Sequence, residues 1–131
     1  AARFHLKPGY VSRAQPEYFE DSVSEKTGHV WQPDVYPLAA LLARRLGCAQ
    51  IIDIGCGRAQ KLAALHPEFL VTGVDFGENI RFCRQQYNFG QWIEADFERT
   101  FAIRQPAPLL SRSVVVCSDV IEHLMDPTAL L

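Results

Sequence analysis

The sequence lacks the patterns of several large protein classes. Its net charge is only −2 and it has no long basic run, so it shows no electrostatic footprint for nucleic acid. Its apolar stretches are far too short to cross a bilayer, and its N-terminus lacks the apolar core of a signal peptide. The four cysteines are scattered, without a Cys-x-x-Cys pair. These absences favour a cytoplasmic protein with buried, reduced thiols and without a nucleic-acid or membrane partner.

The most informative segment that is present runs from Ile51 to Ala59. An apolar strand leads into a Gly-x-Gly turn, and a helix-like stretch follows over 61–66. Glycine lets a ligand approach the backbone closely, and a helix N-terminus offers free N–H groups, so this order builds a ligand site. The Gly-Lys-Ser/Thr ending of a phosphate-binding P-loop is absent. The dinucleotide fingerprint also fails, because Gln60 occupies the place of its third glycine.

What remains is Asp53-x-Gly55-x-Gly57-x-Ala59, which resembles the first motif of the class I S-adenosylmethionine-dependent methyltransferases. The departure is Ala59, which stands where that motif usually has its last glycine. Alanine is the smallest replacement and still suits close packing of helix on strand. For this motif alone, a tight turn in another doubly wound protein stays open as an alternative.

Acidic residues follow the next two expected strands. The strand over 71–75 ends in Asp75, about 20 residues beyond the turn, where Rossmann-type sites bind a ribose diol. A strand over 92–97 follows, with Asp96 at its exit. The resemblance implies that Asp96 accepts from the adenine amino group and that the backbone N–H of Phe97 meets the ring. Phe76 either lies against the adenine face or packs in the core.

The last expected strand, over 114–117, is apolar and β-branched, which is typical of a strand buried on both faces. The segment Ser118 to Pro127 follows it and contains Asp-Val-Ile-Glu-His-Leu. This segment closely resembles a signature of the small-molecule methyltransferase branch. The resemblance covers roughly residues 49–131, and it implies a doubly wound, mainly parallel α/β sheet in three layers.

Class I methyltransferases have seven strands in the order 3-2-1-4-5-7-6, and this chain supplies strands one to four. We therefore expect a Rossmann-like cofactor domain over residues 33–131, truncated after strand four. Strand four then becomes an apolar edge, which soluble proteins avoid. A second copy covering this edge, and hence a homodimer, is one expectation.

The N-terminal residues 1–32 are predicted to form an arm or lid. Tyr10, Tyr18 and Phe19 either close over cofactor and substrate or anchor the arm to the domain. A helix is expected over 34–46, with arginines in its last turn and a glycine at its end. Its apolar face is predicted from helical spacing to consist of Val35, Leu38, Leu41, Leu42 and Leu46.

The resemblance assigns most site residues to cofactor binding. Asp53 is expected to face the methionine ammonium, and the backbone near Gly55, Cys117 and Ser118 to complete that pocket. Arg58 and Lys61 either bind the cofactor carboxylate or are solvated surface charges. The full set of expected cofactor-binding residues is Asp53, Gly55, Cys56, Gly57, Asp75, Phe76, Asp96, Phe97, Cys117 and Ser118.

His123 is the candidate catalytic base. If 119–123 is helical, Asp119, Glu122 and His123 share one face. Bracing of the loop is the first interpretation of this trio, a base the second and a metal site the third; no metal is predicted.

We expect a methyltransferase that uses S-adenosylmethionine, yields S-adenosylhomocysteine and acts on a small-molecule acceptor. The alternative is a cofactor-binding module without independent catalysis. Half of an NAD-dependent dehydrogenase is disfavoured by Gln60 and by the match over 119–124.

Overall fold

The computed structural model describes residues 28–30, 32–99 and 101–130. The expected arm therefore lies almost wholly outside the described residues, together with Tyr10, Tyr18 and Phe19. Its function as a lid stays a prediction. Among the described residues, no helix is both long and apolar enough to span a membrane.

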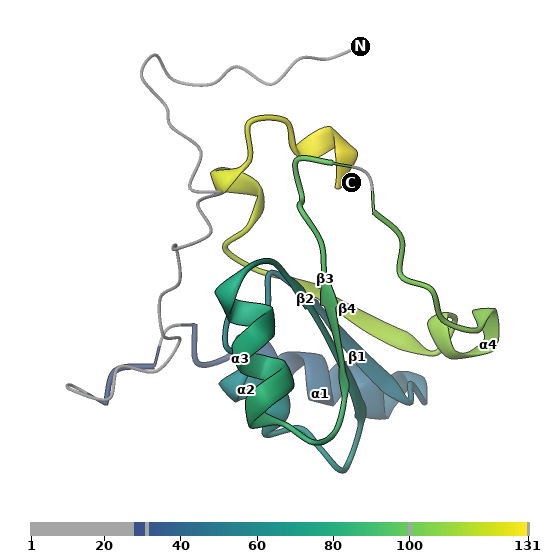
Figure 1. The fold of residues 1–131 in the computed structure, drawn as a ribbon. Helices are drawn as coiled ribbons and strands as arrows, with labels where there is room; N and C mark the ends of the chain where they lie inside the picture. The colour runs from purple at the N-terminus through teal and green to yellow at the C-terminus, as the bar shows by residue number, and fades with distance from the viewer. Residues whose placement is uncertain (1–27, 31, 100, 131) are drawn as a thin grey trace.

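Four strands form one parallel sheet: β1 (Gln50–Ile54), β2 (Leu70–Asp75), β3 (Gln91–Glu94) and β4 (Ser113–Cys117). Their order is β3-β2-β1-β4, and all three pairings are parallel. The carboxyl ends of the strands therefore lie together at one end of the sheet (Figure 1). This arrangement confirms the predicted Rossmann-like α/β sheet and the place of the last strand at its edge.

The main helices cover one face of the sheet. They are α1 (Val35–Leu46), α2 (Gln60–Ala63) and α3 (Glu78–Gln86), and α4 (Ala107–Leu110) precedes β4. Side chains of α1, α2 and α3 share one buried cluster with strand residues such as Ile51 and Val116. A second cluster on the opposite face joins strand residues to the segments that follow β3 and β4, which include the 3-10 helices η1 (Ile121–His123) and η2 (Pro127–Ala129). The stretch after the Gly-rich turn is shorter than predicted, because α2 ends at Ala63.

Helix α1 has the predicted extent but buries a different face. The side chains of Ala39, Ala40 and Ala43 are at most 4% exposed, whereas Leu38 is 55% and Leu46 is 71% exposed. The helix packs on β1 and β4, and alanine side chains let its backbone approach the sheet closely. The predicted leucine face is therefore wrong, although the helical spacing was right.

Strand β4 is not buried on both faces as its composition predicted. Val116 is 6% exposed, but Val115 is 59% exposed and Cys117 is also exposed. The reason is that β4 pairs only with β1 among the described strands, so its outer edge and much of one face are uncovered. The expectation of buried thiols holds for Cys56 and Cys83, while Cys48 is half-buried and Cys117 contradicts it.

Candidate functional site

The Gly-rich turn joins the end of β1 to α2, and its two glycines have different surroundings. The backbone N–H groups of Gly55 and Cys56 donate to the carbonyl of Val74 at 2.8 and 3.2 Å. Gly55 has a φ of +82°, and a Cβ atom there would lie 2.4 Å from Val120 Cγ2. Gly57 has a φ of +55°, but a Cβ there would meet nothing within 4 Å. The first glycine is therefore required by packing. The second has open space where a Cβ atom would lie, although its N–H donates to Asp75 and its carbonyl accepts from the Cys83 thiol.

Ala59 keeps the backbone of the glycine it replaces. Its φ and ψ are 57° and 21°, which is the left-handed region, and it forms the N-cap of α2. Its N–H donates to the carbonyl of Cys56 at 2.9 Å. Ala59 therefore holds a left-handed backbone conformation that glycine adopts at less cost.

Asp75, at the end of β2, binds this turn directly. Its Oδ2 accepts the backbone N–H of Gly57 at 2.7 Å, and its Oδ1 accepts that of Phe76 at 2.8 Å. The side chain is buried, and burial raises the pKa of its carboxyl although these hydrogen bonds and one with Asn79 lower it. The acid expected near the cofactor thus touches the open glycine of the turn.

Asp53 lies within β1, and its side chain is 1% exposed. The hydroxyl of Tyr36 on α1 donates to its Oδ2 at 2.5 Å. Burial raises the pKa of Asp53 to about 7; the bond from Tyr36 opposes this rise, the charge of Asp75 adds to it, and Lys61 opposes it. Burial and the neighbouring Asp53 also raise the pKa of Tyr36.

Sequence analysis missed Tyr36. The signal that finds it is the helical repeat of Tyr36, Ala39, Ala40 and Ala43, which forms the buried face of α1. Leucine is more apolar than alanine or tyrosine, so the leucine repeat of the same helix gives the stronger prediction of a buried face.

The two cations near the turn lie in different places. The Nζ of Lys61 lies 5.0 Å from the centre of the Tyr36 ring, where the charges of Asp53 and Asp119 also act on it. The guanidinium of Arg58 instead lies over the ring of Phe82 at 4.9 Å. Of these two cations, Lys61 is therefore the one that lies beside Tyr36 and the acidic groups near Asp53.

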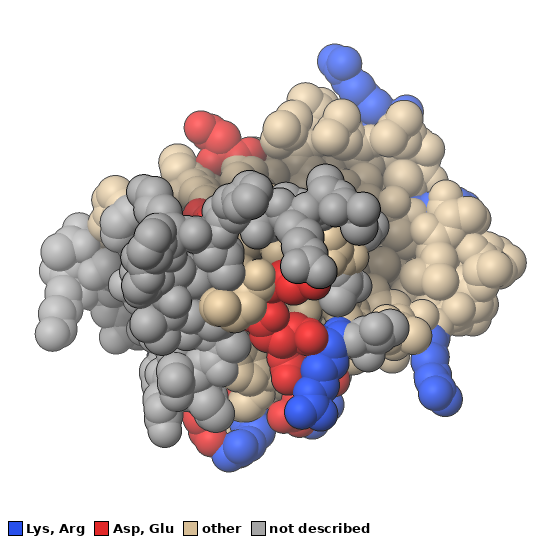
Figure 2. Space-filling model, turned by 90° about the horizontal axis from the view of Figure 1, so that it is seen from above, with Lys and Arg blue, Asp and Glu red and all other residues tan. Residues whose placement is uncertain are grey.

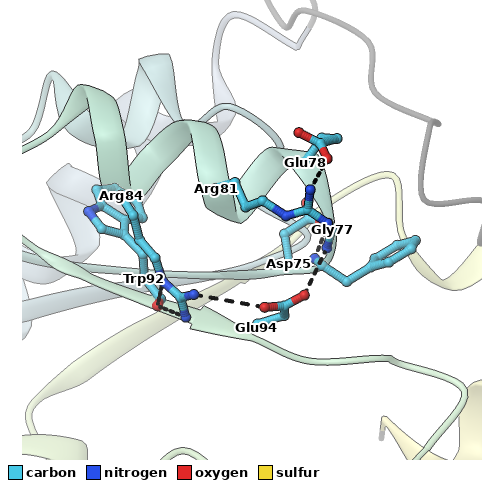
Figure 3. A network of polar contacts seen from close by, with 8 residues as sticks. Asp75, Gly77, Glu78, Arg81, Arg84, Trp92 and Glu94 are labelled. Carbon is cyan, nitrogen blue, oxygen red and sulfur yellow. Dashed lines mark hydrogen bonds and ion pairs between the residues drawn. The ribbon is translucent and has the colours of Figure 1, made fainter.

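Glu94, at the end of β3, is a further acid that sequence analysis did not single out. Its Oε1 accepts the backbone N–H of Gly77 at 3.4 Å, and its Oε2 lies 3.8 Å from Arg84. Figure 3 shows Glu94 and Asp75 at neighbouring strand ends, next to the start of α3. The carboxyl ends of β2 and β3 thus carry one acid each.

The predicted third strand ends earlier than expected. It stops at Glu94, although the N–H of Ala95 still donates to the carbonyl of Asp75 at 2.9 Å. Asp96 is consequently in the following loop, exposed, with its Oδ1 accepting the N–H of Glu98 at 3.0 Å. The ring of Phe97 packs in the core, 5.6 Å from that of Phe101. Phe76 follows β2 directly and is half-buried.

The end of β4 lies next to the Gly-rich turn, because Cys117 pairs with Ile54 in the sheet register. Burial and the charge of Asp53 raise the pKa of the Cys117 thiol. The hydroxyl of Ser118 donates to the side-chain carbonyl of Gln32, which precedes α1. These contacts join β4, β1 and the start of α1 at one end of the sheet.

The predicted helical face of Asp119, Glu122 and His123 does not form. Asp119 has a φ of +56°, and only a single 3-10 turn over Ile121–His123 follows it. The N–H of His123 donates to the carbonyl of Val120 at 3.0 Å. Across the described part of the chain, no three His, Cys, Asp or Glu side chains are arranged to hold a metal ion.

Among the described residues, two buried polar atoms near the turn have no hydrogen-bond partner. They are Oε1 of Gln60, at the start of α2, and Oδ1 of Asn79, at the start of α3. Buried acceptors normally have a partner, so both are suited to a donor from a ligand.

Figure 2 looks along the vertical axis of Figure 1 and shows acidic side chains gathered near the middle of that face.

Comparison with known proteins assigns the family. Residues 52–131 match a family described as methyltransferase domain. The chain belongs to this family. Its members use S-adenosylmethionine. No curated protein matches the chain.

One solved structure is similar to this methyltransferase-family chain. It is S-adenosylmethionine-bound CalS10, an amino pentose methyltransferase from Micromonospora echinaspora involved in calicheamicin biosynthesis. The identity is 20% and the TM-score 0.48, and the match covers 66% of this chain. The match spans 37% of the length of that structure.

Proposed function

We propose that this chain is the cofactor-binding part of a methyltransferase that acts on a small-molecule acceptor. The observation that carries the proposal is the contact between the Asp75 carboxylate and the backbone N–H of Gly57, a residue with open space where a Cβ atom would lie. S-adenosylmethionine, when bound, supplies an activated methyl group. The residues of the chain then have to bind and orient it, and few of them need to move protons.

Asp75 is proposed to bind the ribose of the cofactor. Each of its oxygens accepts one backbone N–H, and the Asn79 side chain also bonds to the carboxylate. A carboxylate has about four acceptor sites, so one site remains for a ribose hydroxyl without breaking the contact that holds the turn. This explains how one buried acid can both brace the turn and bind a ligand.

The adenine is proposed to lie beyond the ends of β2 and β3. Asp96 is exposed and offers a carboxylate to the amino group, while Phe97 offers its backbone N–H. Phe76 offers a half-buried ring next to Asp75. The side chain of Phe97 is engaged in the core, so only its backbone takes part in this proposal.

The methionine end is proposed to lie between β1 and β4. Asp53 offers a carboxylate to the ammonium, and the backbone of Gly55, Cys56, Cys117 and Ser118 surrounds it. Lys61 is the cation suited to the cofactor carboxylate, since it lies beside Asp53 and Arg58 does not. The unpartnered acceptor of Gln60 adds a further polar atom next to this turn.

His123 is proposed first to brace the loop after β4, with a base as the second interpretation. Its place in the 3-10 turn after Val120, which packs on Gly55, puts it next to the Gly-rich turn where a side chain can brace the loop. His123→Ala with cofactor affinity retained and turnover lost would favour the base. His66→Ala is the matched control, because His66 stacks on Phe89.

The experiment that tests the cofactor class is calorimetric titration of the chain with S-adenosylmethionine and, separately, with NADH. Saturable binding of the first and none of the second supports the proposal. Binding of NADH alone contradicts it, as does a folded chain that binds neither.

Transfer of a labelled methyl group to a panel of small hydroxyl and amine acceptors then separates the two functions. Product formation favours an enzyme. Cofactor binding without product on any acceptor favours a binding module that needs a partner for catalysis.

A further inference from the structure

Tyr36 on α1 donates a side-chain hydrogen bond to Asp53, a residue of the proposed cofactor site. It begins the buried face of the helix, and its hydroxyl lies 2.5 Å from Oδ2 of Asp53. The Nζ of Lys61 lies 5.0 Å from the centre of its ring. The side chain of Tyr36 thus extends from α1, bonds to a buried acid and lies beside a cation.

The groups that face Asp53 come from every element around it. Tyr36 is on α1, Lys61 on α2 and Asp75 on β2, and each affects the ionisation of Asp53. Cys56 in the turn and Cys117 on β4 sense its charge in return. Asp119, after β4, acts on Lys61. Among these described groups three acids, Asp53, Asp75 and Asp119, accompany one cation, Lys61, so the site suits a positively charged ligand.

We propose that Tyr36 is a positioning residue, whose hydroxyl holds the Asp53 carboxylate oriented and ionised to receive the ammonium of the cofactor's methionine end. This inference rests on the proposed function. It assigns a role to a residue that lies outside the sequence motifs, and it explains why a tyrosine hydroxyl is present at this position.

The physical reason is the burial of Asp53. A buried carboxylic acid retains its proton unless hydrogen bonds or cations favour the charged form. A protonated acid has no charge with which to attract an ammonium group. A donor on Oδ2 favours ionisation and fixes the plane of the carboxylate, because a hydrogen bond to a charged oxygen is strong and directional.

The test compares two ligands on two proteins. S-adenosylhomocysteine carries the methionine-derived ammonium, and 5′-methylthioadenosine has the same adenosine without the amino-acid end. Tyr36→Phe is expected to weaken S-adenosylhomocysteine about tenfold or more at pH 7, and to leave 5′-methylthioadenosine within about twofold. The ratio of the S-adenosylhomocysteine affinity to the 5′-methylthioadenosine affinity reports on binding of the amino-acid end, because a general loss of fold would weaken both ligands alike.

The pH profile gives a readout that a purely structural effect does not move. Between about pH 5.5 and 7 the ligand ammonium stays mostly protonated. In the wild type the affinity ratio should rise with pH as Asp53 ionises. In Tyr36→Phe the midpoint of this rise should lie at higher pH.

Asp53→Asn is the second variant, in case Tyr36→Phe does not fold. It should lower the ratio and make it independent of pH. Adding Tyr36→Phe to Asp53→Asn should change the ratio no further, because Tyr36 acts through the carboxylate. Tyr87→Phe is the matched control: its hydroxyl donates to the carbonyl of Arg58 at 3.1 Å, and its removal should leave the ratio unchanged.

The outcomes separate the two proposals. If the wild type binds both ligands and Tyr36→Phe changes neither the ratio nor its pH midpoint, the inference about Tyr36 is overturned and the cofactor site stands. If the folded wild type binds neither ligand, the proposed function fails and the inference fails with it.

Discussion

The carboxylate of Asp75 accepts the backbone N–H of Gly57 at 2.7 Å, so the acid at the end of β2 holds the turn at the end of β1. Gly57 lies in the turn after β1, and Asp75 ends the neighbouring parallel strand β2. Because this bond joins two parts of the fold, Asp75 should matter for stability as well as for binding.

Asp75→Asn should destabilise the fold by about 1–3 kcal/mol, because an amide has one acceptor oxygen where two backbone N–H groups need one each. Urea unfolding followed by circular dichroism measures the change. Asp126→Asn is the control, since that exposed side chain caps only the short η2 through Thr128, and it should destabilise the chain less than Asp75→Asn does. Equal losses in the two variants would contradict the bracing role of Asp75.

Ala59→Gly should cost far less than Ala40→Gly, although both side chains are 2% exposed. Ala40 lies in a helix, where glycine costs about 1 kcal/mol besides the lost methyl contacts. Ala59 is left-handed, a conformation that costs an L-residue about 1–2 kcal/mol and glycine almost nothing. We expect Ala59→Gly to lie within about 1 kcal/mol of the wild type in thermal or urea unfolding. A loss as large as that of Ala40→Gly would mean that the turn is not strained.

Gly55→Ala should destabilise the chain more than Gly57→Ala. Both positions have positive φ, but only at Gly55 would the new methyl lie 2.4 Å from Val120. Urea midpoints rank the two variants, and Val120→Ala should recover part of the loss in Gly55→Ala. Gly57→Ala should show its main effect in cofactor affinity, since its methyl would occupy open space beside the turn. A larger stability loss at Gly57 would refute this division.

The stability should fall as pH rises from about 4 to about 7, through Asp53. Burial raises the pKa of this carboxyl to about 7 in the folded chain, above the usual 3.9 of the unfolded chain. In that window the folded state binds more protons than the unfolded state, so raising the pH favours unfolding. The difference in unfolding free energy between the wild type and Asp53→Asn isolates this contribution. A difference that is constant from pH 4 to 7 would rule it out.

The strands could be predicted because their signals are local, whereas their order followed from the family resemblance. Ile51 to Ile54 is an apolar run that a glycine ends, and Asp75 follows a similar run; each marks a strand and its exit. The place of β4 at the edge followed from the resemblance and is confirmed. Pairing of that edge with a second copy stays a prediction.

The predictions that failed depended on three-dimensional surroundings. The leucines and alanines of α1 both recur at helical spacing, and only the close approach of the helix to the sheet decides that Ala39 and Ala43 are buried. The shared face of Asp119, Glu122 and His123 was conditional on a helix over 119–123, and that condition is not met because Asp119 is left-handed.

The site was only partly predictable for the same reason. Motif spacing brought Asp53, Gly57 and Asp75 together, and they do lie at the same end of the sheet. Tyr36 and Glu94 reach this end from α1 and β3 through tertiary contacts, which no short motif encodes.

The central claim is that the ends of β1 and β2 form the cofactor site, and calorimetric titration with S-adenosylhomocysteine tests it most directly. The wild type, Asp75→Ala and the control Asp126→Ala are compared, each shown to be folded by circular dichroism. We predict saturable binding to the wild type and the control, weakened about tenfold or more in Asp75→Ala. A folded wild type that does not bind, or Asp75→Ala with unchanged affinity, would contradict the account.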